Sequence, residues 1–168
     1  NSGGDIYATN GAVLYVADSM FTNSLAVYGA SLYVGAAATI NVLSCTFTDT
    51  SGTYGGLLYA SSGAANFDSV DIINPYAIYD GAGFYLQSST VGILDTQMSS
   101  SHSTQGHGVA AYVSSGSTLS WVGGGVDGSF SDNTGYDGGG FSVIESSSLT
   151  LEDFVLANAH AYRGGGVF

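Results

Sequence analysis

The sequence predicts an all-β fold, a parallel β-helix of about six and a half coils in which each 26-residue unit forms one coil. The first observation is a fixed period, since four tyrosines recur every 26 residues: Tyr7, Tyr33, Tyr59 and Tyr85. Each tyrosine ends a short phrase that opens with glycine. Apolar residues alternate with polar ones or form short runs cut by Gly and Ser, which is typical of strands and turns rather than helices.

The units begin at residues 3, 29, 55, 81 and 107. The fifth unit is longer than the others, the sixth begins at Gly138, and the chain stops within a seventh. Helical repeats usually contain about 33–47 residues. A shorter unit favours about three short strands and three turns, which is one coil of a parallel β-helix.

The first strand of each unit contains the tyrosine. The residues on either side of it are apolar, as with Leu32 and Val34 around Tyr33. Because strand side chains alternate between two faces, these neighbours are expected inside and the tyrosine column outside. In the fifth unit the same pattern places Ala110 and Tyr112 inside, so the outward column is expected along the first four units only.

The second and third strands follow within each unit. The second carries inward residues such as Ile40 and Val42, and the third carries a bulky apolar residue, a spacer, and then Asn or Asp. Asn and Asp tolerate left-handed backbone at turns, and their side chains bond nearby groups. We therefore expect a turn ladder between coils, which the fourth unit breaks with Ser101. The expected ladder residues are Asn23, Asp49, Asn74, Asp132 and Asn158.

The glycine and Phe-x-Asn phrases together resemble the Gly-Gly-Ala-Ile and Phe-x-x-Asn repeat of polymorphic outer-membrane proteins, which belongs to the pectate-lyase-like β-helices. The strict four-residue form occurs once, from Phe130 to Asn133, and the other units shorten it by one residue. The resemblance covers Gly3 to Phe168. It implies a right-handed parallel β-helix on a cell surface or in the extracellular space.

The charge balance excludes several classes of partner. One Arg and no Lys stand against 13 acidic residues, and the formal net charge is −12. Nucleic acids and anionic membrane surfaces are bound through Lys and Arg, so neither is an expected partner. No apolar stretch is long enough to span a membrane, and no signal peptide is recognisable. The single cysteine, Cys45, is expected in the core.

Residues 1–168 are expected to form one β-helix domain without a linker. The chain starts just before a unit and stops inside another, and neither end resembles the polar capping coil that a free solenoid needs. We therefore expect a β-helix uncapped at both ends. It is either a segment of a longer repeat protein or a filament subunit whose open strand edges pair with other copies.

No set of residues for catalysis, cofactor binding or metal binding stands out, so we expect neither an enzyme nor a cofactor. A lyase of the pectate-lyase-like class needs a basic residue to abstract a proton, and only Arg163 is available. The close acidic pairs fall in different coils: Asp68 with Asp71, Glu152 with Asp153, and Asp127 with Asp132. Ice binding needs threonines stacked at one repeat offset, and no such column is expected.

Three interpretations of the tyrosine column remain open: strand propensity with ring stacking alone, a protein interface, or a platform for sugar rings. Soluble monomers rarely leave a continuous aromatic stripe bare. We expect a non-enzymatic extracellular structural protein, a β-helix building block of a filament, appendage or surface layer. Its partners would be other copies or neighbouring repeats, with glycans a further candidate. The alternatives are an adhesin or autotransporter passenger segment and a polysaccharide-active enzyme.

Overall fold

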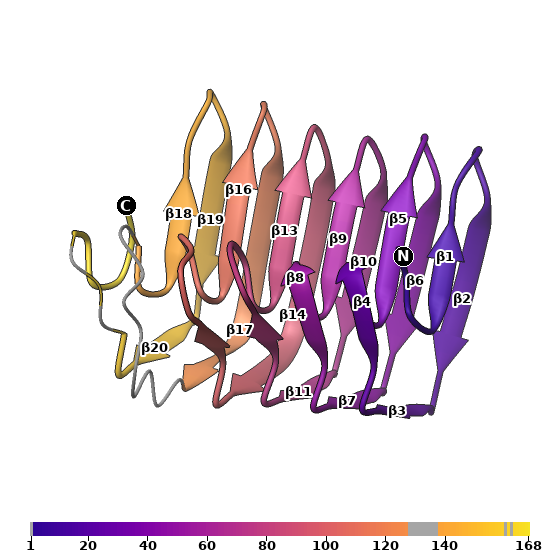
Figure 1. Cartoon of the computed structure of the whole chain (residues 1–168), viewed down its shortest axis with the longest axis horizontal. Coiled ribbons are helices and arrows are strands. Elements are labelled where there is room, and N and C mark those ends of the chain that lie inside the picture. Colours follow the sequence, from indigo (N-terminus) through magenta and orange to yellow (C-terminus); the bar gives the residue numbers. More distant parts are fainter. Residues whose placement is uncertain (1, 128–137, 160, 162) are drawn as a thin grey trace.

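The computed structural model describes residues 2–127, 138–159, 161 and 163–168. These residues form strands and turns wound into a parallel β-solenoid, and they include no helix that could cross a membrane. In Figure 1 the chain climbs the near sheet, passes over the top and descends the far sheet as it advances along the rod, so the solenoid is right-handed, as predicted. The 26-residue spacing is confirmed over about five turns, somewhat fewer than the six and a half expected.

The near sheet contains one strand from each unit, and its six strands lie parallel and in register. Each strand follows a glycine phrase and buries the residues on either side of the tyrosine position. The strands in order are β1 (Ile6–Ala8), β5 (Leu32–Gly35), β9 (Leu58–Ser61), β13 (Phe84–Gln87), β16 (Ala111–Ser114) and β18 (Phe141–Val143).

The far sheet descends behind the near sheet and continues along the bottom of the rod (Figure 1). Its upper strands are β2 (Val13–Ala17), β6 (Thr39–Leu43), β10 (Ala64–Asp68) and β19 (Ser148–Glu152). Its lower strands are β3 (Met20–Thr22), β7 (Thr46–Thr48), β11 (Asp71–Ile73) and β20 (Val155–Ala157). In the fourth and fifth units the two parts join into single strands, β14 (Thr90–Ser99) and β17 (Thr118–Asp127).

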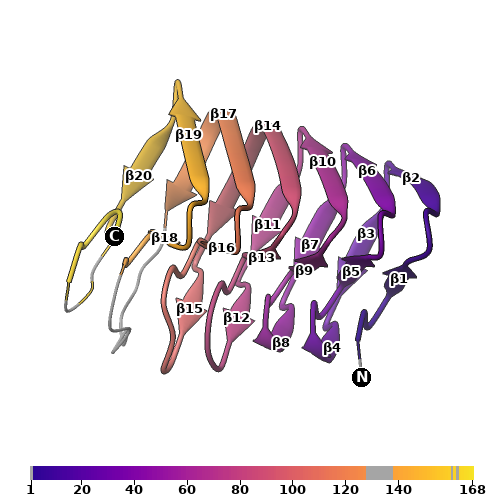
Figure 2. The same ribbon diagram turned by 90° about the horizontal axis from the view of Figure 1, so that it is seen from above.

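A third, smaller sheet returns the chain to the near side. It contains β4 (Leu25–Tyr28), β8 (Ser51–Tyr54), β12 (Tyr76–Ala77) and β15 (His102–Ser103), and Figure 2 shows it as a separate row below the near sheet. The first three units therefore hold four strands each, one more than expected. The additional strand is the one in this third sheet, because the upper and lower strands of the far sheet are the second and third strands that the sequence predicts. A single left-handed residue separates the upper from the lower strand, namely Asp18, Ser44 or Ser69.

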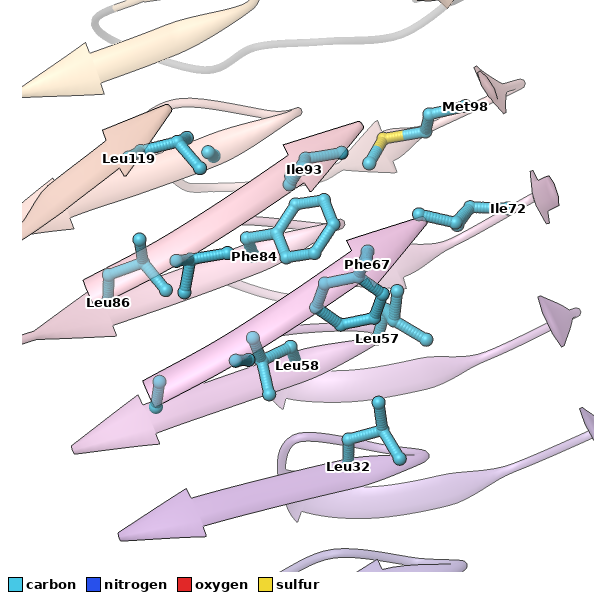
Figure 3. Close-up of a cluster of buried hydrophobic side chains, with 14 of the residues drawn as sticks. Leu32, Leu57, Leu58, Phe67, Ile72, Phe84, Leu86, Ile93, Met98 and Leu119 are labelled. Atoms are coloured by element: carbon cyan, nitrogen blue, oxygen red, sulfur yellow. The ribbon is translucent and has the colours of Figure 1, made fainter. Parts of the chain in front are cut away.

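The core lies between the near and far sheets, whose inward side chains meet in one continuous cluster (Figure 3). Phe67 of the far sheet packs edge-on against Phe84 of the near sheet, with ring centroids 5.3 Å apart. Ile40 and Val42 are buried, as the alternation predicts, and so is Cys45. The buried apolar area of these stacked columns is the main force that holds the coils together.

Backbone hydrogen bonds join each coil to the next and run along the axis of the rod. The Leu32 N–H donates to the Leu57 carbonyl at 3.0 Å, and the Phe84 N–H donates to the Ala110 carbonyl at 3.0 Å. The strand pairs of the described residues are parallel. An inner strand such as β9 is hydrogen-bonded to a neighbour on each edge. This arrangement places chemically equivalent residues of successive units directly above one another.

Candidate functional site

Five tyrosines of the near sheet form one continuous outward column, which we call the tyrosine ladder. Its members are Tyr7, Tyr33, Tyr59, Tyr85 and Tyr112, each directly opposite the next in register. Successive ring centroids are 4.8, 5.6, 4.8 and 5.0 Å apart, and the ring planes are nearly parallel. This stacking follows from the strand spacing of about 4.8 Å, because in-register tyrosines on adjacent strands lie side by side at about that distance.

The sequence prediction ended the ladder one coil too early. Ala110 is buried as expected, but Tyr112 was expected inside and instead points outward above Tyr85, between the buried residues Ala111 and Val113 of β16. One additional residue before β16 shifts the alternation, because strand pairing preserves the match of apolar faces rather than the 26-residue count. The sixth position of the column is Ser142, as the sequence suggested, and it is buried.

A second row of tyrosines flanks the ladder, and each of its members stands directly or one residue before a glycine phrase in the sequence. We call Tyr28, Tyr54 and Tyr79 the flanking tyrosines. The rings of Tyr28 and Tyr54 stack with centroids 5.8 Å apart, and the ring of Tyr79 is tilted by 30° against that of Tyr54 at 5.2 Å. The ring of Tyr28 also contacts that of Tyr59 edge-on at 5.0 Å, and Tyr54 contacts Tyr85 in the same way at 5.5 Å. The two rows therefore interlock into one surface of eight tyrosines.

A glycine turn sets the angle between the two rows. Gly55 follows Tyr54 and has a φ of 64°, and a Cβ at this position would overlap the Leu58 carbonyl oxygen. Only glycine accepts both the left-handed backbone and this close approach. The turn directs the chain from the third sheet into β9, and each of Tyr28 and Tyr54 meets the ladder tyrosine that lies two units further along the chain.

The stacking decides which parts of the rings reach solvent. Both faces of Tyr33, Tyr59 and Tyr85 are covered by the rings above and below, so these residues present ring edges and hydroxyl groups outward. Tyr7, at the end of the ladder, is 56 % exposed. The surface is thus a row of phenol edges, which suits hydrogen bonding and edge contacts better than the face-on stacking that sugar rings use.

Burial and mutual proximity raise the pKa of Tyr33, Tyr59 and Tyr85 above the usual value for tyrosine. Asp80 lies at the edge of the same surface, where its Oδ1 accepts a hydrogen bond from the His107 backbone N–H at 2.8 Å. Burial raises the pKa of this carboxyl group, and the His107 N–H only partly opposes that effect. With their pKa values raised, Tyr33, Tyr59 and Tyr85 stay neutral at physiological pH.

The turn after each lower strand carries the predicted Asn or Asp in left-handed conformation. Asn23, Asp49, Asn74 and Asn158 have φ values of 57°, 55°, 56° and 56°. The Asn74 amide donates to Asp49 Oδ1 at 2.7 Å across adjacent coils. In the fourth unit the turn residue is Ser100, one position earlier than expected. Asp132 lies outside the described residues.

The other candidates do not assemble into a reactive site in the part of the chain described. The guanidinium of Arg163 lies over the ring of Phe168, 5.2 Å from its centroid. Among described residues no three His, Cys, Asp or Glu side chains come close enough to hold a metal ion. The expectation that threonines form no column was wrong in part, since Thr39, Thr90 and Thr118 share one outward column with Ala64 between the first two.

Comparison of the chain with protein-family models, with curated protein sequences and with solved structures gave no match.

Proposed function

We propose that this chain is a non-enzymatic, extracellular structural protein, a β-helix building block of a filament, appendage or surface layer. The observation that carries the proposal is the tyrosine surface formed by the ladder and the flanking tyrosines. Eight tyrosines on one side of a soluble rod form an amphipathic patch, and tyrosine is enriched at protein interfaces. We propose that copies of the rod associate laterally through this surface.

The distribution of charge supports the same side of the rod as the contact. The chain carries a net charge of −12, so two copies repel one another over most of their surface. Of the acidic residues described, only Asp5 and Asp80 lie in the segments just before the near-sheet strands that carry the ladder tyrosines. Five others gather at the corner that follows the upper strands of the far sheet: Asp18, Asp68, Asp95, Glu152 and Asp153. Asp80 and Glu145 act on ladder tyrosines, so the tyrosine surface carries fewer acidic residues than this corner but is not free of them.

The resemblance to polymorphic outer-membrane-protein repeats and to pectate-lyase-like β-helices agrees with this proposal at the level of architecture and of a surface location. It also keeps the adhesin interpretation open, in which the same rod is a passenger segment that binds a host or matrix molecule. Such a passenger would use its exposed surface for a foreign partner and would stay monomeric by itself.

Sedimentation velocity over a range of concentrations, with electron microscopy of the same samples, tests the proposal. The double variant Tyr28→Asp and Tyr79→Asp places carboxylates on the exposed edge of the tyrosine surface, where each side chain is 38 % exposed. The control is Tyr15→Asp, which introduces one such carboxylate at an 81 % exposed tyrosine on the far sheet.

We expect the parent protein and the Tyr15→Asp control to associate as concentration rises, and the double variant to sediment as a monomer. A parent protein that remains monomeric at high concentration would contradict the proposal. Association that both variants retain equally would place the contact elsewhere on the rod.

A further inference from the structure

The outer face of the far sheet, on the side of the rod away from the tyrosine ladder, carries a furrow along the axis. Two adjoining hollows of about 320 and 340 Å³ form it, and both are lined by Asn66 and Asp68. The first crosses β2, β6 and β10, and the second crosses β10, β14 and β17. Hollows of this volume lie within the range of ligand sites.

The two walls of the furrow differ in chemistry because they are two outward columns of the same strands. One wall is polar and consists of Tyr15, Asn41, Asn66 and Ser120. The other is largely apolar and consists of Ala17, Leu43, Leu94 and Val122, with Asp68 between the two leucines. Leu43 and Leu94 are 47 % and 43 % exposed, which is unusual for leucines in the middle of a sheet.

The polar wall contains ordered groups with unused hydrogen-bonding capacity. The Asn66 amide donates to Asn41 Oδ1 at 2.9 Å, which fixes both side chains in line. Asn66 Oδ1 accepts no hydrogen bond from any described residue. It faces Gly92 on the next strand, and a Cβ added to Gly92 would lie 3.2 Å from this oxygen. The ring of Tyr15 is 81 % exposed at one end of the furrow.

The charges of the furrow select against anionic ligands. Asp68 is the only carboxylate among the residues that line the two hollows, no Lys, Arg or His lines them, and the chain as a whole is strongly negative. A carboxylated or sulfated ligand would meet only repulsion, with no Lys or Arg among the lining residues to offset it. The occupant that fits is a neutral molecule with hydroxyl groups on its edges and apolar C–H surfaces.

The spacing of the coils along the furrow favours an extended glycan over an extended peptide as the ligand. The walls repeat once per coil, about every 4.8 Å along the axis. An extended peptide advances about 3.3 Å per residue and would fall out of step with the walls within one coil. The sugar rings of an extended β-linked polysaccharide repeat at a length close to the coil rise, so one ring can lie over each coil.

We propose that this furrow binds an extended, neutral, β-linked glycan, with sugar hydroxyls bonded to the Asn41, Asn66 and Ser120 wall and ring C–H groups against Leu43 and Leu94. The surface is distinct from the tyrosine surface, so a rod could associate with other copies and hold a glycan at the same time.

Titration of the isotope-labelled protein with cellohexaose, mannohexaose and xylohexaose, followed by NMR amide shifts, tests the proposal. Tri-galacturonate and a β-strand-forming hexapeptide serve as comparison ligands. The blocking variant is Gly92→Val, which fills the furrow with a residue suited to a strand, and Asn66→Ala removes the polar contact without adding bulk. The matched control is Gln87→Val, an exposed outward position on the near sheet.

At least one neutral hexasaccharide is expected to shift amides of β6, β10 and β14. Gly92→Val should weaken that binding more than tenfold and Asn66→Ala about three- to tenfold, the cost of one hydrogen bond. The Gln87→Val control and the Tyr28→Asp, Tyr79→Asp variant should bind as the parent does. The proposal is overturned if no neutral hexasaccharide binds at millimolar concentration, if the shifts map to the near sheet, or if the anionic sugar or the peptide binds equally well.

Discussion

At the scale of single residues, the turns of this rod depend on side chains that accept left-handed backbone. Asn74 combines two contributions there, since it holds a φ of 56° and donates to Asp49 of the preceding coil at 2.7 Å. Asn and Asp visit this conformation at low cost, whereas other residues with a Cβ lose about 1–2 kcal/mol in it. The turn ladder is therefore a contribution to stability that a count of buried apolar area would miss.

We predict that Asn74→Ala lowers the free energy of unfolding by about 2 kcal/mol, because it loses both the hydrogen bond and the favourable backbone. Asn74→Gly keeps the backbone conformation and should lose only about 1 kcal/mol. Urea denaturation followed by circular dichroism measures both. Equal losses for the two variants would show that left-handed backbone strain does not contribute.

Asp80 is the residue whose ionisation should oppose folding. Its folded-state pKa is raised by burial, so its contribution to stability is fully present below the unfolded value of about 3.9 and is lost as the pH rises through the folded value. We predict that Asp80→Asn, which keeps an oxygen acceptor for the His107 N–H, is more stable than the parent at pH 7. The advantage should disappear near pH 3. Unfolding curves at both pH values check this, and a variant less stable at pH 7 would contradict it.

At the scale of elements, the tyrosine ladder couples neighbouring strands of the near sheet through their side chains. Tyr59 stacks on Tyr33 and Tyr85 at 5.6 and 4.8 Å and also meets Tyr28 edge-on. Each aromatic pair contributes about 0.5–1.5 kcal/mol beyond its buried area. The ladder therefore stabilises the rod whether or not it also forms an interface.

We predict that Tyr59→Ala lowers the free energy of unfolding by about 2–3 kcal/mol, since it interrupts the ladder in the middle. Tyr59→Phe should stay within about 0.5 kcal/mol of the parent, because the hydroxyl makes only a long contact of 3.4 Å to Gln87. The control Tyr15→Ala removes an exposed tyrosine outside the ladder and should have a similarly small effect. A large loss for Tyr59→Phe would show that the hydroxyl row, not ring stacking, stabilises the sheet.

The elements also show where sequence reasoning succeeded and where it stopped. The period and the alternation around Tyr33 identified the interior of the near sheet, because strand geometry alone fixes which side chains share a face. The same rule failed at Tyr112, since nothing in one sequence says where an additional residue is absorbed. The contact between Tyr28 and Tyr59 joins two units that are not neighbours in the sequence, so the repeat pattern does not reveal it. The furrow lies between two outward columns of the far sheet. Neither the column of Asn66 nor that of Leu94 holds one residue type in every unit, so the sequence does not indicate the furrow.

At the scale of the whole molecule, an unbalanced negative charge opposes the compact rod. The net charge is −12, and Arg163 is the single basic residue apart from the three histidines. Repulsion among the acidic residues is spread over the surface, and one Arg without any Lys can offset little of it. Because these charges are exposed and separated, salt should screen them effectively.

We predict that raising sodium chloride from about 10 mM to about 0.5 M, which shortens the screening length from about 30 Å to below 8 Å, raises the thermal unfolding midpoint. The same change should also promote association, because it reduces repulsion between copies. Calorimetry and sedimentation at the two concentrations measure these effects. A midpoint that falls with added salt would show that attractive charge pairs outweigh repulsion.

The direction of the backbone hydrogen bonds has a mechanical consequence. They run along the rod, so tension applied between its two ends pulls in line with the bonds that join one coil to the next. Coils at an end would then unwind one at a time, and each would add the length of one 26-residue unit. Such a rod extends under load in steps and shortens again when its coils rewind, which suits a material that must absorb a pull rather than resist it rigidly.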